Sequence, residues 1–149
     1  MLRSFAFVTV LSALPALAAA GDLIRKDSVH SVSETVNRLA AAVEGAGAKV
    51  FARVDHAAGA ASIGSELRPV EMLMFGNPKL GTPVMAMNPA AGLDLPMRVV
   101  VYETADGKVT LAYHDPKALT AHEGVAGDAP VLGKIAGALG KLTDKAVSP

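Results

Sequence analysis

The chain has 149 residues, in which 14 lysines and arginines balance 14 aspartates and glutamates, and it contains no cysteine. This length supports one domain, and the charge balance excludes the strongly basic surface that nucleic-acid binding requires. The lack of cysteine excludes disulfides, thiolate metal sites, cysteine nucleophiles and lipidation at a cysteine.

The N-terminal residues predict a Sec-type signal peptide over 1–20. A short positive start is followed by an apolar run from Phe5 to Leu14, and Ala18–Ala20 supplies the small residues that signal peptidase requires. The apolar run is shorter than the roughly 20 residues that a bilayer span needs. Cleavage would leave residues 21–149 as one α+β domain in the bacterial periplasm or medium. No further apolar span or polybasic segment predicts membrane association after cleavage.

The first part of this domain is predicted to contain two strands separated by a helix. A short strand is expected around Leu23–Ile24, and Lys49–Asp55 alternates apolar and polar residues as a strand with one buried face does. Between them, Ser31 to Ala46 is a predicted helix, and Ser31 and Glu34 have capping-box spacing. Its apolar residues recur at steps of four, three and four and so share one face. They are Val32, Val36, Leu39 and Val43.

The middle of the chain predicts two further strands. Ala57 to Gly64 is rich in alanine and glycine and favours either a small helix or a close-packed loop. Leu67 to Phe75 is a predicted third strand, and Met97 to Thr104 a fourth. Three consecutive valines in the fourth strand indicate a central position in the sheet.

A hairpin and a helix are predicted to complete the domain. Asp106-Gly107 is a two-residue hairpin signal, and Lys108 to His114 would be the antiparallel partner strand. Ala129 to Lys145 is a predicted helix with glycines at 133, 137 and 140, each of which costs about 1 kcal/mol relative to alanine. We expect these glycines to bring the helix backbone close to the sheet. The apolar stripe of this helix consists of Leu132, Ile135, Leu139 and Leu142.

The order of these elements predicts an α+β fold, because strands and helices do not strictly alternate. A two-layer sandwich would bury the apolar stripes of both long helices. We therefore expect a mostly antiparallel sheet of about five strands with two main helices on one face.

The stretch FGNPKLGTPVMAMNP, residues 75–89, concentrates glycine, proline, asparagine and methionine. Gly76 and Gly81 have the spacing of a phosphate loop, but the next two positions hold threonine and proline instead of the required lysine and hydroxyl residue. Two helix caps explain the composition better: Asn77-Pro78, and then Thr82-Pro83 before a short helix over Val84–Met87, closed by Asn88-Pro89. The backbone N–H groups at such caps, with Lys79 beside them, indicate a small anion or carboxylate site.

Other residues raise the question of metal binding or catalysis. Two M-x-M pairs, Met72 with Met74 and Met85 with Met87, could hold Cu(I), although core packing explains them more simply. His114-Asp115 and His122-Glu123 form a local cluster that could bind a metal, although Asp115 before Pro116 is more simply a helix cap. Asp94 in GLDLP could line a pocket or cap a turn. These residues do not assemble an acid, a base and a nucleophile.

The chain resembles the domain of unknown function 302 family in a series of motifs. In order they are SxxETVxRL (31–39), LRP (67–69), FGNPKxGTPxM (75–85), GLDLP (92–96) and YxDP (113–116). Met85 matches the family pattern, whereas Met87 does not belong to it. The resemblance implies a two-layer α+β fold like that of the TATA-box-binding-protein-like group, and homodimers. It implies no established activity and no cofactor.

We therefore predict a small-ligand-binding or accessory module rather than an enzyme. Its pocket rim would combine three loops and contain Asn77, Lys79, Thr82, Asp94, Tyr113 and His114. Three alternatives remain open. They are a hydrolase-type enzyme using Asp94 and His114 or Glu103, a Cu(I)-handling protein using Met85 and Met87, and a purely structural dimeric interaction protein.

Overall fold

The computed structural model describes residues 23–119 and 124–149, in which helices pack on an antiparallel sheet. The predicted signal peptide lies outside these residues. Within the described ranges, no helix has the length and apolar character needed to cross a membrane. The elements are β1 (Leu23–Ser28), α1 (Val32–Gly45), β2 (Lys49–Asp55), α2 (His56–Ala61), β3 (Val70–Gly76), α3 (Pro78–Met87), the 3-10 helix η1 (Pro89–Leu93), β4 (Met97–Glu103), β5 (Val109–His114), α4 (Pro116–Leu119) and α5 (Pro130–Val147).

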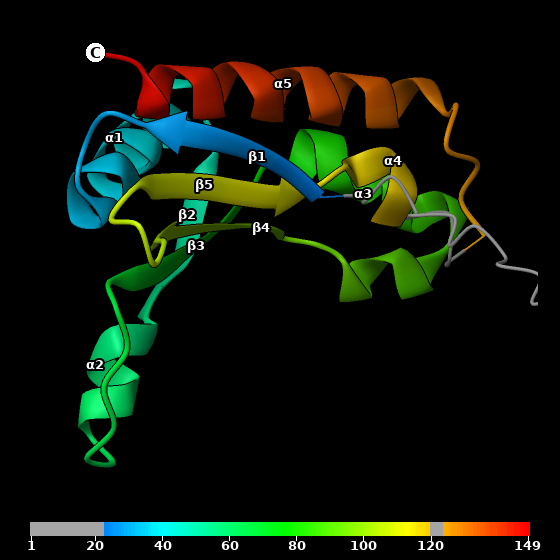
Figure 1. Ribbon diagram of the computed structural model, residues 1–149. Helices are drawn as coiled ribbons and strands as arrows, with labels where there is room; N and C mark the ends of the chain where they lie inside the picture. The colour runs from blue at the N-terminus through cyan, green and yellow to red at the C-terminus, as the bar shows by residue number, and fades with distance from the viewer. Residues whose placement is uncertain (1–22, 120–123) are drawn as a thin grey trace, which may run out of the picture.

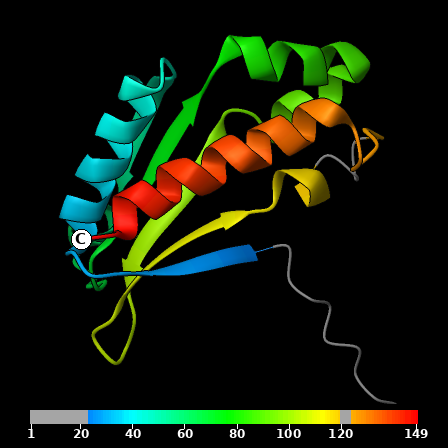
Figure 2. The ribbon, with the colours of Figure 1, turned by 90° about the horizontal axis from the view of Figure 1, so that it is seen from above.

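The five strands lie in the order β1-β5-β4-β3-β2, and each neighbouring pair is antiparallel. β4 occupies the centre, as its three valines predict. α1 and α5 pack against each other on one face of the sheet, whereas α2 projects beyond the ends of β2 and β3, away from α5 (Figures 1 and 2). The predicted α+β two-layer sandwich is confirmed.

Both long helices bury the stripes that their sequences predict. Ser31 caps α1 by accepting a hydrogen bond from the backbone N–H of Glu34 at 3.3 Å, and this satisfies one of the free N–H groups at the helix start. The four predicted residues of α1 are at most 3% exposed. On α5, Leu132, Ile135 and Leu139 are buried, and Leu142 packs against them at the edge of the core.

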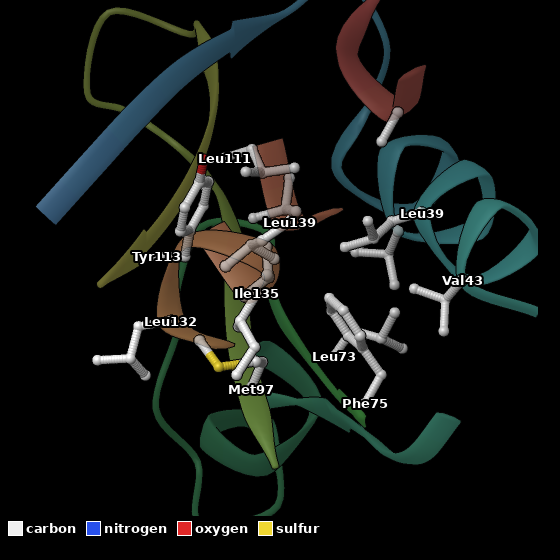
Figure 3. Packing of buried hydrophobic residues seen from close by; sticks show 14 of the residues in the cluster. Leu39, Val43, Leu73, Phe75, Met97, Leu111, Tyr113, Leu132, Ile135 and Leu139 are labelled. Atoms are coloured by element: carbon white, nitrogen blue, oxygen red, sulfur yellow. The ribbon is translucent and has the colours of Figure 1, made fainter. Parts of the chain in front are cut away.

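The core lies between these helices and the sheet. Leu73 of β3, Val99 of β4 and Leu111 of β5 face the helices and are at most 1% exposed. Figure 3 shows side chains from α1 and α5 meeting those of β3, β4 and β5. Burying one such side chain stabilises the fold by about 1.5–3 kcal/mol, so this layer holds the helices on the sheet.

One end of the helical layer, where α1 meets the last two turns of α5, is fully packed. Leu39 of α1 is fully buried there, and so are Thr143 and Ala146 of α5. The Arg38 side chain donates hydrogen bonds to the carbonyl oxygens of Ala146 at 3.2 Å and Ser148 at 2.7 Å. Arg38 thereby satisfies carbonyl groups at the end of α5 that have no partner within the helix. We call these five residues the closed end.

The β4–β5 hairpin forms as predicted, but its turn has three residues instead of two. The backbone N–H of Thr104 bonds to the carbonyl of Lys108 at 2.8 Å, and Gly107 between them has a φ of +80°. This is the three-residue turn that ends in a left-handed residue. The Asp106 carboxylate accepts a 2.6 Å bond from the Thr104 hydroxyl and lies 3.0 Å from the Lys108 ammonium. The hydrogen bond from Thr104, which has the larger effect, and the contact with Lys108 together lower the pKa of Asp106 to about 2.

α3 differs from its prediction because it is one continuous helix. The first cap is confirmed, since the Asn77 side chain accepts from the backbone N–H of Lys79 at 3.0 Å. The second cap is wrong: Thr82 and Pro83 lie inside α3. A proline in the second turn removes one hydrogen bond, but Val84 behind it is 0% exposed. Burial of Val84 in the core therefore holds the helix together through Pro83.

The expected role of the α5 glycines is also wrong. A Cβ atom added at Gly133, Gly137 or Gly140 would have no neighbour within 4 Å. These glycines therefore face open space and do not bring the helix backbone close to the sheet. Their cost in helix propensity is offset by the buried stripe on the other side of α5.

Two further boundaries are decided by the structure. The alanine-rich segment after β2 is a helix, α2, in which no residue is buried. β3 begins at Val70 instead of Leu67 and follows Pro69, which has no N–H to donate to a strand ladder.

Candidate functional site

A pocket of about 290 Å³ opens between α3, α5 and the end of the sheet where β3 and β4 lie side by side. Its base consists of four core side chains, which Figure 3 shows close together: Phe75, Met97, Ile135 and Leu139. Pockets for small molecules usually measure about 300–1,000 Å³. This pocket is at the lower end of that range, and it opens directly onto the hydrophobic core.

One wall of the pocket is formed by α3. Pro78, Gly81, Thr82 and Met85 lie on one side of this helix, by their spacing of three, four and seven residues, and Leu80 in the first turn also lines the pocket. The cap at Asn77 fixes where this helix begins, and the Asn77 carbonyl accepts from the N–H groups of Leu80 and Gly81, both at 2.9 Å. Gly81 keeps the wall thin, because a Cβ there would lie 3.6 Å from the Leu95 side chain across the pocket edge.

The opposite wall is a face of α5 with the same spacing. Ile135, Ala138, Leu139 and Leu142 line the pocket. Ala138 leaves room that a larger side chain would occupy, and Ala46 and Ala48 before β2 add two more small residues. The pocket therefore exists because small residues stand on both walls at positions where large ones would close the gap between the helices.

Phe51 stands at the opening of the pocket and is 50% exposed. The pairing of β2 with β3 shifts register between Val50 and Ala52, so Phe51 falls at a bulge. Bulges redirect side chains, which accounts for an exposed aromatic ring on an edge strand. The Lys49 ammonium lies 5.6 Å from the centroid of this ring, within the range of a cation–π contact.

The lining is almost entirely hydrocarbon. Among the described residues that line the pocket, Asn77 and Thr82 have the polar side chains and none carries a charge. The Asn77 carboxamide oxygen is already used as the cap of α3. Apart from the Thr82 hydroxyl, the described lining residues offer no nucleophilic side chain, and none of them has an acid or base that titrates near neutral pH. The lining can remove apolar surface of a ligand from water.

The predicted rim residues divide between different parts of the molecule. Asn77 and Thr82 line the pocket, and Lys79 is exposed in the first turn of α3. Asp94 lines a second cavity of about 10 Å³ and lies 3.8 Å from the Arg98 guanidinium. That cavity has room for about one water molecule.

Tyr113 and His114 are not among the residues that line the pocket. Tyr113 is 4% exposed and belongs to the core, with the Lys26 ammonium 5.9 Å from its ring centroid. His114 is exposed at the end of β5, opposite Leu23 of β1. Two of the three predicted loops thus meet at the pocket, since Leu95 and Pro96 of the GLDLP loop line it together with Asn77, whereas the end of β5 does not line it. The binding role of the predicted rim residues stays a prediction.

The geometry offers little for the hydrolase and metal alternatives. Across residues 23–119 and 124–149, no histidine is hydrogen-bonded to a carboxylate, and Glu103 pairs with Arg68 at 3.3 Å. No cluster of three histidine, aspartate or glutamate side chains occurs in these ranges. His122 and Glu123 lie outside them. Met85 and Met87 are two positions apart on α3, about 200° around its axis, so their side chains diverge.

Sequence reasoning missed most of the pocket wall, including Phe51, Leu95 and Ala138. A signal for the α3 wall was present: residues 78, 81, 82 and 85 have the helical spacing, but the predicted second cap divided them between two elements. For Phe51 there was no such signal, because its orientation depends on the register shift in β2.

Comparison with known proteins finds one family model, described as "Domain of unknown function DUF302", that matches residues 24–147. The crystal structure of an uncharacterized conserved DUF302 protein from Bacillus stearothermophilus superposes with a TM-score of 0.76. It shares 21% sequence identity, and the match covers 83% of this chain and 97% of that one. This likeness shows the fold.

Two curated relatives, from Brucella suis and Brucella abortus, are 44% identical over 109 residues, or 72% of this chain. Both are named fluoride-specific ion channel FluC 1. The match covers 43% of the first and 40% of the second, so the chain spans about two-fifths of the length of these relatives.

Proposed function

The chain belongs to the DUF302 family, and from that premise we propose that its domain binds a small apolar molecule in the pocket between α3 and α5. The observation that carries this proposal is the lining, in which hydrocarbon side chains from five elements surround an open volume of about 290 Å³. Core packing normally leaves few voids larger than a water molecule. A gap of this size on the core is therefore best explained by an occupant.

The size of the pocket limits the ligand. The pocket volume of about 290 Å³ lies at the lower end of the range for small-molecule pockets. A hydrocarbon chain of about eight to ten carbons would fill it, and each methylene buried contributes about 0.8 kcal/mol. Eight to ten methylenes would contribute about 6–8 kcal/mol, and association costs at least about 4 kcal/mol, so we expect a dissociation constant on the order of millimolar.

The name of the Brucella relatives does not transfer to this pocket. A fluoride ion is small and strongly hydrated, and burying an ion in an apolar site without a paired charge is costly. The described lining residues offer no charge to such an ion. An apolar molecule matches the same lining without this cost.

A neutral apolar dye, N-phenyl-1-naphthylamine, tests the proposal by its fluorescence in the presence of the protein. We expect saturable binding that decanol displaces. In the variant Gly81→Leu, a large side chain would enter the pocket from α3, and binding should fall at least tenfold. Gly137→Leu is the matched control, because it makes the same change on a helix where a side chain meets open space. Equal binding by the two variants, or no saturable binding by the wild type, contradicts the proposal.

A second candidate function, assembly with another copy of the chain, is favoured by the sheet face opposite α1 and α5. Register and alternation place a row of partly exposed apolar side chains there, across β2, β3 and β4. They are Val54, Met72 and Val100. None of them belongs to the main core cluster. Next to this face, α2 buries none of its residues, and Ile63 behind it is 81% exposed. A six-residue helix is not stable by itself in water, so we propose that a second copy covers both features.

Light scattering after size-exclusion chromatography tests this assembly. The wild type should elute as a dimer, and Val100→Lys should give a monomer, because the charge would be buried without a partner in the interface. Val29→Lys is the control, since Val29 is 68% exposed and lies outside this face. A monomeric wild type at high concentration rules the assembly out.

Export is part of the proposal as well. Its support is the pattern of residues 1–20, with a positive start, an apolar run and small residues before Gly21. N-terminal sequencing of the protein from its natural cells should begin at Gly21, and retention of Met1 or Leu2 would contradict export by this route.

A further inference from the structure

We infer that the ligand of the α3–α5 pocket is an amphiphile with an anionic head group, of which a medium-chain fatty acid is the simplest example. This inference rests on the proposed function, since it assigns a charge to the exposed end of a molecule whose apolar part fills the pocket. The charges around the pocket opening carry the argument.

The ionisable residues next to the pocket lining in the sequence are mainly basic. Four lysines are direct chain neighbours of lining residues, and all four are exposed. Asp94 and Arg98 are also neighbours of lining residues, but they are 3.8 Å apart and offset each other. The four lysines are Lys49, Lys79, Lys134 and Lys141.

Each lysine is placed near the pocket by a different local feature. The Lys49 ammonium lies 5.6 Å from the ring centroid of Phe51, which stands at the opening. Lys79 is in the first turn of α3, between the lining residues Pro78 and Leu80.

The other two lysines flank Ala138 on the α5 wall. Lys134 precedes it by four residues and Lys141 follows it by three. Side chains at these spacings are neighbours on a helix surface, with Cβ atoms about 5–6 Å apart. The basic residues are thus carried by three elements that line the pocket, β2, α3 and α5.

These lysines have no ionic partner elsewhere in residues 23–119 and 124–149. The ion pairs of this part of the chain use Lys26, Arg53, Arg68, Arg98 and Lys108. A chain with equal numbers of acidic and basic residues thus carries unpaired basic residues on the described segments that line this pocket. A head group with negative charge would be attracted there without leaving water, whereas a cationic head group would be repelled.

Three ligands with the same ten-carbon chain separate charge from hydrophobicity: decanoate, decanol and decyltrimethylammonium. Each would displace N-phenyl-1-naphthylamine from the wild-type protein at about pH 8, where the carboxylate is fully ionised. Exposed ion pairs are individually weak, so we expect decanoate to bind roughly tenfold more tightly than decanol and the cation to bind most weakly. Raising the salt from about 20 mM to about 500 mM should remove most of the difference, because it shortens the screening length.

The quadruple variant Lys49→Gln, Lys79→Gln, Lys134→Gln, Lys141→Gln tests the source of the preference. It should bind decanoate and decanol equally while its affinity for decanol stays at the wild-type value. Lys108→Gln, on the hairpin, is the control and should keep the wild-type preference. Binding of decanol in the quadruple variant also reports that the protein is folded.

The outcomes distinguish this inference from the proposed function. Equal affinity of the wild type for decanoate and decanol at low salt overturns the inference and leaves an apolar binding site. A preference that persists in the quadruple variant also overturns it, because the lysines would not be its cause. If no ligand displaces the dye, or if the dye never binds, the proposed function fails and the inference fails with it.

Discussion

The two ends of the helical layer pack in opposite ways on the same sheet. At the closed end, α5 meets α1 without a gap, and Thr143 and Ala146 are fully buried. At the pocket end, α5 faces α3 across a volume of about 290 Å³. The difference lies in the partner helix: α1 presents Val36 and Leu39 to the core, whereas α3 presents Gly81 and Thr82 to the pocket.

This contrast teaches that one helix can serve two purposes along its length. The closed end holds α5 on the sheet by tight packing and by the hydrogen bonds of Arg38. Because this attachment already stabilises α5 on the sheet, the other end of the helix can leave apolar surface without a partner in the chain. We therefore expect changes at the closed end to alter stability, and changes at the pocket end to alter binding.

The largest effect is expected for Leu39→Ala at the closed end. Leu39 is 0% exposed, and removing a buried leucine side chain costs about 2–5 kcal/mol because a cavity remains. Urea unfolding should show this loss, while the fraction that stays folded should bind N-phenyl-1-naphthylamine with unchanged affinity. A weaker affinity in the folded fraction would mean that the two ends are coupled.

A smaller loss is expected for Arg38→Ala. The substitution leaves carbonyl groups of the last turn of α5 without their donor. Hydrogen bonds from a charged group contribute about 1.5–3 kcal/mol when buried, and partial exposure of this site reduces the expected loss to about 1–2 kcal/mol. Thermal unfolding measures it. Arg38→Lys should recover little of the loss, since one ammonium does not reproduce the geometry of the guanidinium.

At the pocket end, Gly81→Ala should act in the opposite direction on stability. Alanine is favoured over glycine inside a helix by up to about 1 kcal/mol, and its Cβ would meet the Leu95 side chain at an ordinary contact distance of 3.6 Å. We expect a gain of about 0.5–1 kcal/mol in urea unfolding together with weaker dye binding. A gain in stability without any change in binding would place the ligand elsewhere.

The smallest effect on stability is expected in the β4–β5 hairpin. The hairpin lies outside both the closed end and the pocket end, so it serves as a reference for the other variants. The pKa of Asp106 is lowered to about 2 in the folded protein, below the usual value of about 3.9 for the unfolded chain. Its stabilising contribution is therefore present above about pH 4 and disappears as the pH falls toward 2. Asp106→Asn should remove this part of the pH dependence in thermal unfolding, without an effect on dye binding. NMR titration of the carboxyl carbon in the wild type checks the pKa directly.

The elements that could be predicted from the sequence are those whose signals are local. The Ser31 cap, the valine-rich central strand and the stripe on α5 depend on neighbours within a few residues, and the structure confirms them. The turn at Asp106-Gly107 was placed correctly, although the pairing of Thr104 with Lys108 lengthens it by one residue.

The features that sequence reasoning missed are those that depend on packing between distant segments. The local pattern at Pro83 predicts the start of a helix, because it does not indicate that Val84 is buried in the core. In the structure, Pro83 lies inside α3. The α5 glycines looked like contact points, but the side of α5 on which they lie faces open space. The sequence predicts part of the pocket: the stretch around Asn77 and the GLDLP segment both line it, the latter through Leu95 and Pro96, while α5 and Phe51 supply walls that no local motif indicates.

The position of β1 has a consequence for the order of folding. β1 is the first strand among the described residues, yet its partner in the sheet is β5, so that Leu23 pairs with His114. During synthesis, β1 has no partner strand until β5 has left the ribosome. Contacts between residues so far apart in the sequence also form slowly. The sheet edge is thus completed late. That delay suits a polypeptide that has to cross a membrane before it folds, which is the route that its first twenty residues predict.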